Sequence, residues 1–161
     1  MTFESQPTSE TGLRAPRTFA IRIGIDNYQA SHMPKRSGSV NDAVQLYRLL
    51  RLVAGIPEDQ ISLLCDQEAT RVGILDEFKS LIANPTVQRG DTVVVYFSGL
   101  VKLAPAPIGS DVGLLETICP VDEGVQESGL ESHGIPDRTI AALLFQLLQT
   151  HDLNIVRPSV H

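Results

Sequence analysis

The sequence predicts an α/β fold in which helices cover a mostly parallel sheet. The first observation is a continuous run of β-branched and aromatic residues at positions 92–97, between an Arg-Gly-Asp turn and Ser98-Gly99. Such a run is typical of a strand buried on both faces, as in parallel sheets. The second observation is that strand-like and helix-like segments alternate along the chain, which is the order found in α/β layered folds.

Composition limits the classes of partner. The chain has 161 residues, of which 42% are hydrophobic and 20% charged, so one globular domain is expected. Its 13 basic and 19 acidic residues give a net charge of −6, which argues against nucleic acid as a partner. The two cysteines form no disulfide or metal-binding pattern, so a reducing, cytoplasmic location is expected. No apolar run reaches membrane-spanning length, and no membrane association is expected.

The first half of the chain predicts two strands and two helices after a polar tail at residues 1–16, which we expect to be disordered. Residues 18–25 form the first strand, where Arg22 needs either a carboxylate partner or an open face. After a loop at 26–39, a helix begins near Ser39 and ends at Gly55 and Pro57. Residues 60–64 form a short strand, and Thr70 caps a second helix that ends at 84–85. The apolar stripes of the two helices are Ala43, Leu46, Leu50 and Val53, then Ile74, Phe78, Leu81 and Ile82.

The second half predicts the central strand at 92–97, a long connection, a third helix and a last strand. Residues 103–132 are rich in proline, glycine and acidic residues, with an apolar island at 114–119, and a connection of this length is usually functional or mobile. Asp137 is expected to cap the third helix. A strand begins at 154–156, and Arg157-Pro158 stops it, which leaves a short tail at 157–161.

Five blocks in this order resemble the caspase-like cysteine peptidases of the metacaspase and fungal caspase-domain group, a peptidase C14-like family. The resemblance covers residues 18–156 and implies a caspase-like three-layer sandwich. Residues 17–156 would be its N-terminal, large-subunit-like part, with the C-terminal strands missing. The blocks are FAIRIGIDNY at 19–28, SGSVNDA at 37–43, YFSG at 96–99, ETICPVDEG at 116–124 and GIPDRTI at 134–140.

The resemblance also implies a catalytic Cys-His pair that this chain lacks. In the family a histidine directly follows the Ser-Gly at the end of the central strand, and a glycine lining the oxyanion site comes next. Those positions hold Leu100 and Val101, and the chain stops before the family's cysteine motif. The four histidines and two cysteines match neither position of the pair: His32, His133, His151, His161, Cys65 and Cys119. We therefore predict a catalytically inactive relative, a pseudo-peptidase.

Four further residues match family positions. Asp42 matches an aspartate of an acidic S1 pocket for Arg or Lys, and Ser98 a serine beside it. Alternatively, Asp42 forms a capping box with Ser39, itself a helix N-cap, and Ser98 is a strand-ending hydroxyl bonded to local backbone. Asp122 and Asp137 match blocks that can carry calcium ligands in relatives. Their alternatives are a solvated turn at Asp122-Glu123 and the helix cap at Asp137. No cofactor is expected apart from this calcium.

Three functions remain open at this point. The domain is an inactive relative that binds a basic peptide segment or a caspase-like partner. Alternatively, it is a non-functional or partner-dependent fragment of a peptidase whose complete form cleaves after Arg or Lys. In that case the strand at 92–97 has an open edge, which favours pairing or aggregation. The third possibility is an ordinary active peptidase of which this chain is a defective version.

Overall fold

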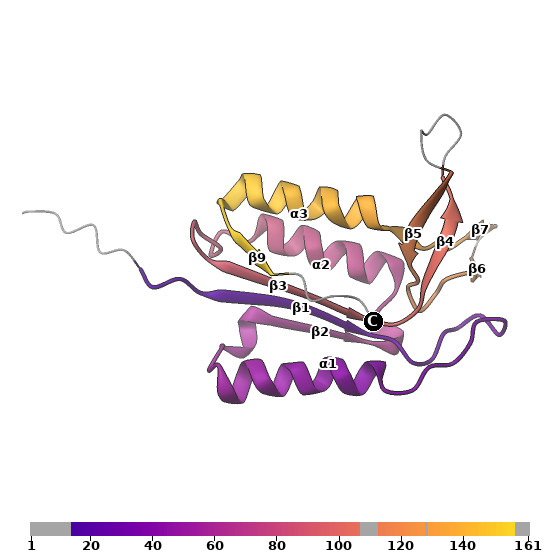
Figure 1. Ribbon diagram of the computed structural model, residues 1–161, viewed down its shortest axis with the longest axis horizontal. Coiled ribbons are helices and arrows are strands. Elements are labelled where there is room, and N and C mark those ends of the chain that lie inside the picture. The colour runs from indigo at the N-terminus through magenta and orange to yellow at the C-terminus, as the bar shows by residue number, and fades with distance from the viewer. Residues whose placement is uncertain (1–13, 107–112, 128, 157–161) are drawn as a thin grey trace, which may run out of the picture.

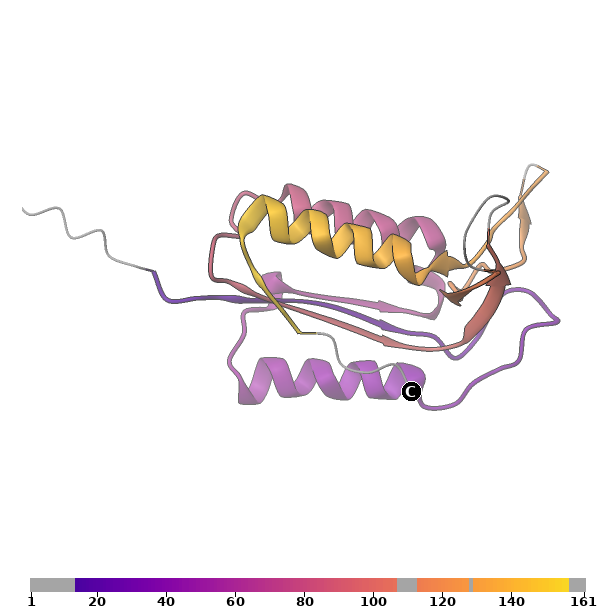
Figure 2. The same cartoon turned by 45° about the horizontal axis from the view of Figure 1, so that its top comes forward.

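A four-stranded parallel sheet forms the centre of the fold, with helices on both faces (Figures 1 and 2). The computed structural model describes residues 14–106, 113–127 and 129–156. Its strand order is β2-β1-β3-β9, and all three pairings are parallel. Helix α1 covers one face, and α2 and α3 cover the other. The elements are β1 (Thr18–Gly24), α1 (Ser39–Arg48), β2 (Ile61–Cys65), α2 (Arg71–Ala83), β3 (Thr92–Ser98), α3 (Asp137–His151) and β9 (Asn154–Val156).

These elements confirm the predicted fold class and its mostly parallel sheet. Alternate residues of β1 and β3 serve two apolar clusters. Phe19, Ile21 and Val93 pack with the buried faces of α2 and α3, whereas Ala20 and Val94 pack on the α1 side. The apolar run of β3 is thus shared between both faces, although Val94, Val95 and Tyr96 keep partial exposure.

Arg22 is completely buried in β1, and neither predicted environment for it is correct. Its guanidinium donates hydrogen bonds to the backbone carbonyls of Ala43 at 2.9 Å and Ser62 at 3.2 Å. The ring of Tyr47 lies 4.7 Å from its Cζ atom. Backbone carbonyls and an aromatic face therefore solvate this charge in place of a carboxylate. Burial lowers the pKa of Arg22 to about 10, although Tyr47 and Cys65 oppose this effect.

The helix starts differ from the prediction at α1 and agree with it at α2. Helix α1 begins after Gly38, whose φ of 106° suits glycine, and Ser39 is its first residue. The N–H groups of Ser39 and Val40 donate to the side chain of Asp26, so the cap comes from the preceding loop and not from the Ser39 hydroxyl. Thr70 caps α2 as predicted, because its hydroxyl accepts from the Gly73 N–H at 3.0 Å.

The apolar stripe predicted for the first helix is wrong at its far end. The helix continues beyond α1 as a π-helical turn, η1 (Leu49–Val53), and short 3₁₀ turns η2 (Glu58–Gln60) and η3 (Asp66–Glu68) flank β2. Ala43 is fully buried, but Val53 is 77% exposed. A π turn advances the chain by more residues than an α turn, which rotates the predicted stripe away from the sheet.

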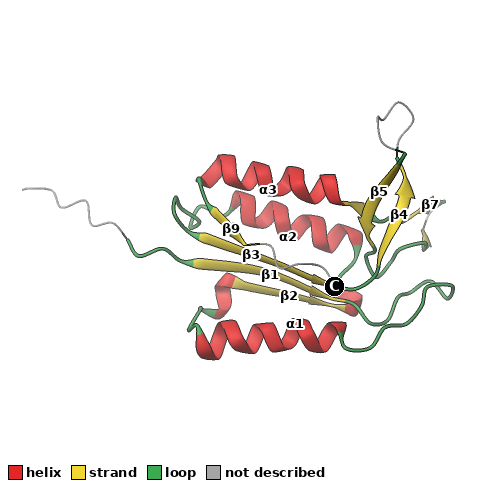
Figure 3. Ribbon diagram, viewed as in Figure 1, coloured by secondary structure: helices red, strands yellow, loops and turns green. Residues whose placement is uncertain are grey.

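The segment predicted as a long connection contains a second, antiparallel sheet (Figure 3). Its strands are β4 (Val101–Pro105), β5 (Leu114–Ile118) and β8 (Ile135–Pro136), in the order β4-β5-β8. A small hairpin, β6 (Gln126–Glu127) with β7 (Leu130–Glu131), follows β5. The N-cap of α3 is Pro136, so Asp137 is the first helical residue and not the cap. The strand predicted at 154–156 is confirmed as β9.

The chain before β1 is anchored to the turn that precedes β3. Residues 1–13 of the expected tail and the tail at 157–161 lie outside the described residues. Arg14, by contrast, donates to both carboxylate oxygens of Asp91 at 2.8 Å. Asp91 is fully buried and also accepts the N–H groups of Arg17 and Gln88. Among the described residues, no helix is long and apolar enough to cross a membrane.

Candidate functional site

A cleft of about 370 Å³ lies at the carboxyl end of β3, where open parallel sheets place their binding sites. Four segments form it: the β3–β4 junction, the strand β5, the loop before α1 and the first residue of α3. We call its apolar lining residues (Leu100, Val101 and Ile118) the floor and its charged ones (Arg36, Glu116 and Asp137) the rim. The lining residues are Arg36, Gly99, Leu100, Val101, Glu116, Thr117, Ile118 and Asp137.

Leu100 is fixed at the floor of this cleft by its backbone and its side chain. Its N–H donates to the Tyr28 hydroxyl at 2.7 Å, and its carbonyl accepts from the Cys119 N–H at 2.9 Å. Its side chain packs against the main apolar cluster. Burial raises the pKa of Tyr28 to about 12, despite the opposing bond from Leu100, so this hydroxyl stays neutral. The side chain at position 100 has no titratable or hydrogen-bonding group, so it offers no base at this point of the cleft.

Gly99 allows this close packing. A Cβ atom at Gly99 would lie 2.8 Å from the Phe97 ring and 3.0 Å from the Tyr28 hydroxyl. Phe97 is itself buried in the main cluster and has little room to move. Only glycine fits at this position, which explains the Ser-Gly break after the central strand in structural terms.

Neither cysteine has the environment of a nucleophile. Cys119 is 1% exposed, and burial raises the pKa of its thiol even though the charge of Lys102 acts in the opposite direction. The pKa of Cys65 is raised by burial and by the neighbouring carboxylates of Glu68 and Asp66. Reactive cysteines need the opposite, a lowered pKa in an accessible, electropositive setting. Neither thiol lines the cleft.

The described histidines also lie away from the cleft. His32 is close to Gly124, because a Cβ there would lie 2.9 Å from the imidazole Cε1. The carbonyl of His133 accepts from Arg71, and a ring nitrogen of His151 lies 2.9 Å from the Ile82 carbonyl. None of the three lines the cleft. His161 lies outside the described residues.

The two residues predicted for an S1 pocket do not line the cleft. Asp42 is exposed in the first turn of α1, and no capping box with Ser39 forms. Ser98 is buried as the last residue of β3, and its carbonyl accepts the Ile25 N–H. The carboxylates of the cleft belong to Glu116 and Asp137. Sequence reasoning missed Glu116 as a site residue because its strand was taken as a connection, although the apolar island around it was a signal.

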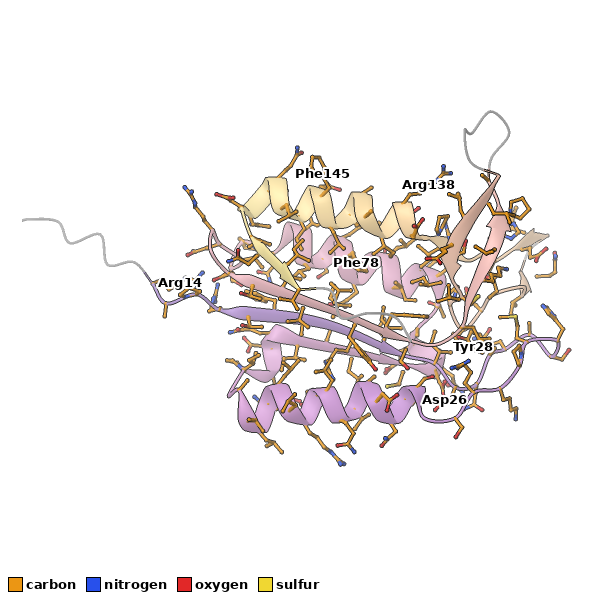
Figure 4. All side chains as sticks on the ribbon, in the orientation of Figure 1. Arg14, Asp26, Tyr28, Phe78, Arg138 and Phe145 are labelled. Atoms are coloured by element: carbon orange, nitrogen blue, oxygen red, sulfur yellow. The ribbon has the colours of Figure 1, made fainter. Side chains whose placement is uncertain are left out.

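Two carboxylates, Asp66 and Asp26, hold the loop that carries Arg36; Asp26 is labelled in Figure 4. Asp66, at the end of β2, accepts the N–H groups of Asp26 at 2.7 Å and Asn27 at 2.9 Å. Burial would raise the pKa of Asp66, but the bond from the Asn27 side-chain amide and the two backbone bonds outweigh it and lower the pKa. The Asp26 carboxylate in turn caps α1. The backbone carbonyl of Asp26 accepts the Arg36 N–H at 2.8 Å. This side of the cleft is thus tied to β1, β2 and α1 together.

The two predicted calcium ligands, Asp122 and Asp137, each accept hydrogen bonds from the protein itself. Asp122 is half-buried, and its two oxygens accept from the Arg71 N–H at 2.8 Å and the Ser132 hydroxyl at 2.9 Å. Asp137 lies on the rim of the cleft, and its side chain accepts the Arg138 N–H. Within the described ranges, no three Asp, Glu, His or Cys side chains come together as metal ligands. The predicted solvated turn is also wrong, because Glu123 is 2% exposed and pairs with Lys102.

Comparisons with known proteins agree with this architecture. The family model of peptidase C14, described as the caspase domain, matches residues 17–155. A crystal structure of the protein GSU0716 from Geobacter sulfurreducens superposes with a TM-score of 0.61 at 19% sequence identity. That match covers 88% of this chain and 49% of the Geobacter chain, so this chain spans about half the length of its neighbour. No curated protein matches the sequence.

Proposed function

The chain belongs to the caspase-domain family of peptidases, and on that premise we propose that it binds a peptide segment without hydrolysing it. The observation that carries this proposal is Leu100. Amide hydrolysis by a cysteine peptidase needs a base to generate the thiolate, and the residue two positions after β3 has an aliphatic side chain that packs against the apolar cluster. The raised pKa values of Cys65 and Cys119 support the same conclusion.

Binding is supported by the cleft itself. Its floor of Leu100, Val101 and Ile118 offers apolar contact, and its rim carries the carboxylates of Glu116 and Asp137. A segment with a basic residue beside an apolar one complements this distribution of charge. Arg36 adds a cation that suits a carbonyl or carboxylate of the same segment. Asp42, one turn into α1, stays in this proposal as an outer contact for a basic side chain.

The experiment is a paired cleavage and binding assay. Fluorogenic peptides with Arg, Lys or Asp before the scissile bond should release no fluorophore above the blank. Unlabelled Arg and Lys peptides should bind saturably, with weaker binding in Glu116→Gln and Asp137→Asn and unchanged binding in Lys79→Gln, a distant exposed site. Cleavage that disappears in Cys65→Ala or Cys119→Ala would refute the proposal.

A second candidate is a partner-dependent fragment of a caspase-domain peptidase, and the edge of β3 favours it. The Asn154 N–H donates to the Asp91 carbonyl, so odd-numbered residues of β3 turn their backbone groups toward β9. The pairing with β9 reaches only Val94, and no described strand pairs with Val95 or Phe97 on that side. This candidate predicts self-association or capture of a strand-bearing partner. A soluble monomer that melts cooperatively, measured by light scattering and calorimetry, counts against it.

A further inference from the structure

The turn that follows β5 is closed by an ion pair between buried Glu123 and Lys102, whose side chain is 44% exposed. Glu123 is 2% exposed, and its Oε1 is bound by the ammonium group of Lys102 on β4. From this geometry we propose that Lys102 is a built-in cation for the turn at 120–124, so that this part of the fold is independent of divalent cations. The proposal concerns a place where the family resemblance led to an expectation of calcium, and it does not depend on the proposed function.

Burial makes a cation at Glu123 necessary. A carboxylate removed from water is costly unless a positive charge or several hydrogen bonds stabilise it. The second oxygen, Oε2, is buried and has no hydrogen-bond partner among the described residues. Among the described residues, Lys102 is the only cation within ion-pair distance of Glu123. The ammonium group therefore supplies most of the stabilisation that this carboxylate receives.

The surroundings of Glu123 leave little room for another arrangement. A Cβ at Gly134 would lie 3.1 Å from Glu123 Oε2, 3.0 Å from the Ile118 carbonyl oxygen and 2.2 Å from the Thr117 methyl group. The segment is held there by Arg71, which donates to the carbonyls of His133 and Gly134. Glu123 is thus enclosed by backbone on one side and by Lys102 on the other.

The neighbouring carboxylate is already engaged by the protein. Asp122 uses one oxygen to accept the Arg71 N–H at the start of α2 and the other to accept the Ser132 hydroxyl. Calcium requires six to eight oxygen ligands at about 2.3 to 2.6 Å. To bind both carboxylates, it would have to displace the ammonium group from Glu123 and share the Asp122 oxygens with these two donors. An internal ammonium group needs neither change.

The position of Lys102 connects this ion pair to the cleft. Lys102 lies two residues after Leu100, and its backbone faces Thr117 in the β4–β5 pairing. Val101 and Ile118, also paired in that register, belong to the floor of the cleft. The pair Lys102–Glu123 therefore fixes the strands that form the floor, and it does so at any calcium concentration. On this proposal, an ammonium group of the chain itself takes the place of a metal ion beside the floor of the cleft.

Thermal unfolding of the full chain tests this inference. Wild-type protein should melt at the same temperature in EDTA and in millimolar CaCl₂. Lys102→Met should lower the melting temperature by about 2 to 8 °C, because it removes the cation of a buried carboxylate, while water at the exposed lysine end screens part of the pair. Lys102→Arg should retain most of the wild-type value, and Lys102→Met combined with Glu123→Gln should recover more than half of the loss. The matched control is Lys79→Met, which removes an exposed lysine paired with exposed Asp76.

Calcium-dependent melting of the wild type would overturn the proposal. So would a Lys102→Met variant that melts like Lys79→Met, because Lys102 would then not stabilise the turn. If Lys102→Met does not fold, the wild-type comparison in EDTA and CaCl₂ still decides the question. Terbium luminescence sensitised by protein aromatic groups gives a second readout, and saturable terbium binding by the wild type that Asp122→Asn removes would also contradict it.

Discussion

Replacing Asp91 should destabilise the protein more than replacing any exposed acid, because one buried carboxylate joins three segments. Asp91→Ala leaves the N–H groups of Arg17 and Gln88 without their acceptor, at about 1 to 3 kcal/mol each. The ion pair with Arg14, whose side chain is 35% exposed, adds at most about 1 kcal/mol after solvent screening. We expect a total loss of about 3 to 5 kcal/mol at neutral pH, or on the order of 10 °C in melting temperature.

Urea unfolding at several pH values measures both the size and the origin of this effect. Burial alone would raise the pKa of Asp91, but the bonds from Arg14, Arg17 and Gln88 lower it. The stabilisation is therefore complete above the unfolded-state pKa of about 3.9 and is lost as the pH falls through the lower folded-state pKa. The difference between wild type and Asp91→Ala should shrink over that acidic range.

Asp76→Ala is the control, since Asp76 pairs with Lys79 at 2.8 Å on the surface, and we expect a change below about 0.5 kcal/mol. An Asp91→Ala variant no less stable than Asp76→Ala would show that the anchoring of the chain before β1 has no energetic weight. A difference from wild type that stays constant through the acidic range would show that the charge of Asp91 is not its cause.

Three further predictions follow from single contacts. Arg22→Met leaves two carbonyls without a donor and should cost about 1 to 3 kcal/mol in urea unfolding; a neutral result would mean that burying the charge cancels those bonds. Gly134→Ala places a methyl group 2.2 Å from a side chain and should cost about 1 to 3 kcal/mol. The control Gly113→Ala meets nothing within 4 Å and should melt like wild type. Tyr28→Phe removes the acceptor of the Leu100 N–H, so exchange of that amide should accelerate and stability fall by about 1 kcal/mol; unchanged exchange would contradict the bond.

The parallel sheet could be predicted because its strands carry their own signals. The apolar run of β3 and the alternation of segments depend on local sequence, and the cap at Thr70 depends on a residue three positions away. The cap of α1 could not be found in this way, because Asp26 lies thirteen residues before Ser39 in the chain. The carbonyl partners of Arg22 come from two further elements and were equally out of reach.

The antiparallel sheet was missed because its strands look like loop. β4 and β5 are short and partly exposed, with Leu103 at 62% and Leu114 at 57% exposure, and the segment between them is rich in proline and glycine. Half of the lining residues of the cleft belong to this antiparallel sheet. The sequence therefore predicted the site only at the carboxyl end of β3. Buried Glu123 is paired with Lys102, 21 residues earlier in the chain, and no spacing in the sequence reveals that contact.

The all-parallel order of the main sheet has a consequence for how the chain folds. No strand of that sheet pairs with a neighbour through a hairpin, so each pairing requires a crossover and a loop closure before any ladder forms. During synthesis β1 can pair with β2 as soon as that strand emerges, but its other edge stays open until β3 follows. Folding dominated by such distant pairings is slow, and the nascent chain exposes an apolar strand edge throughout that interval. Chaperone dependence during synthesis is therefore expected from the topology alone.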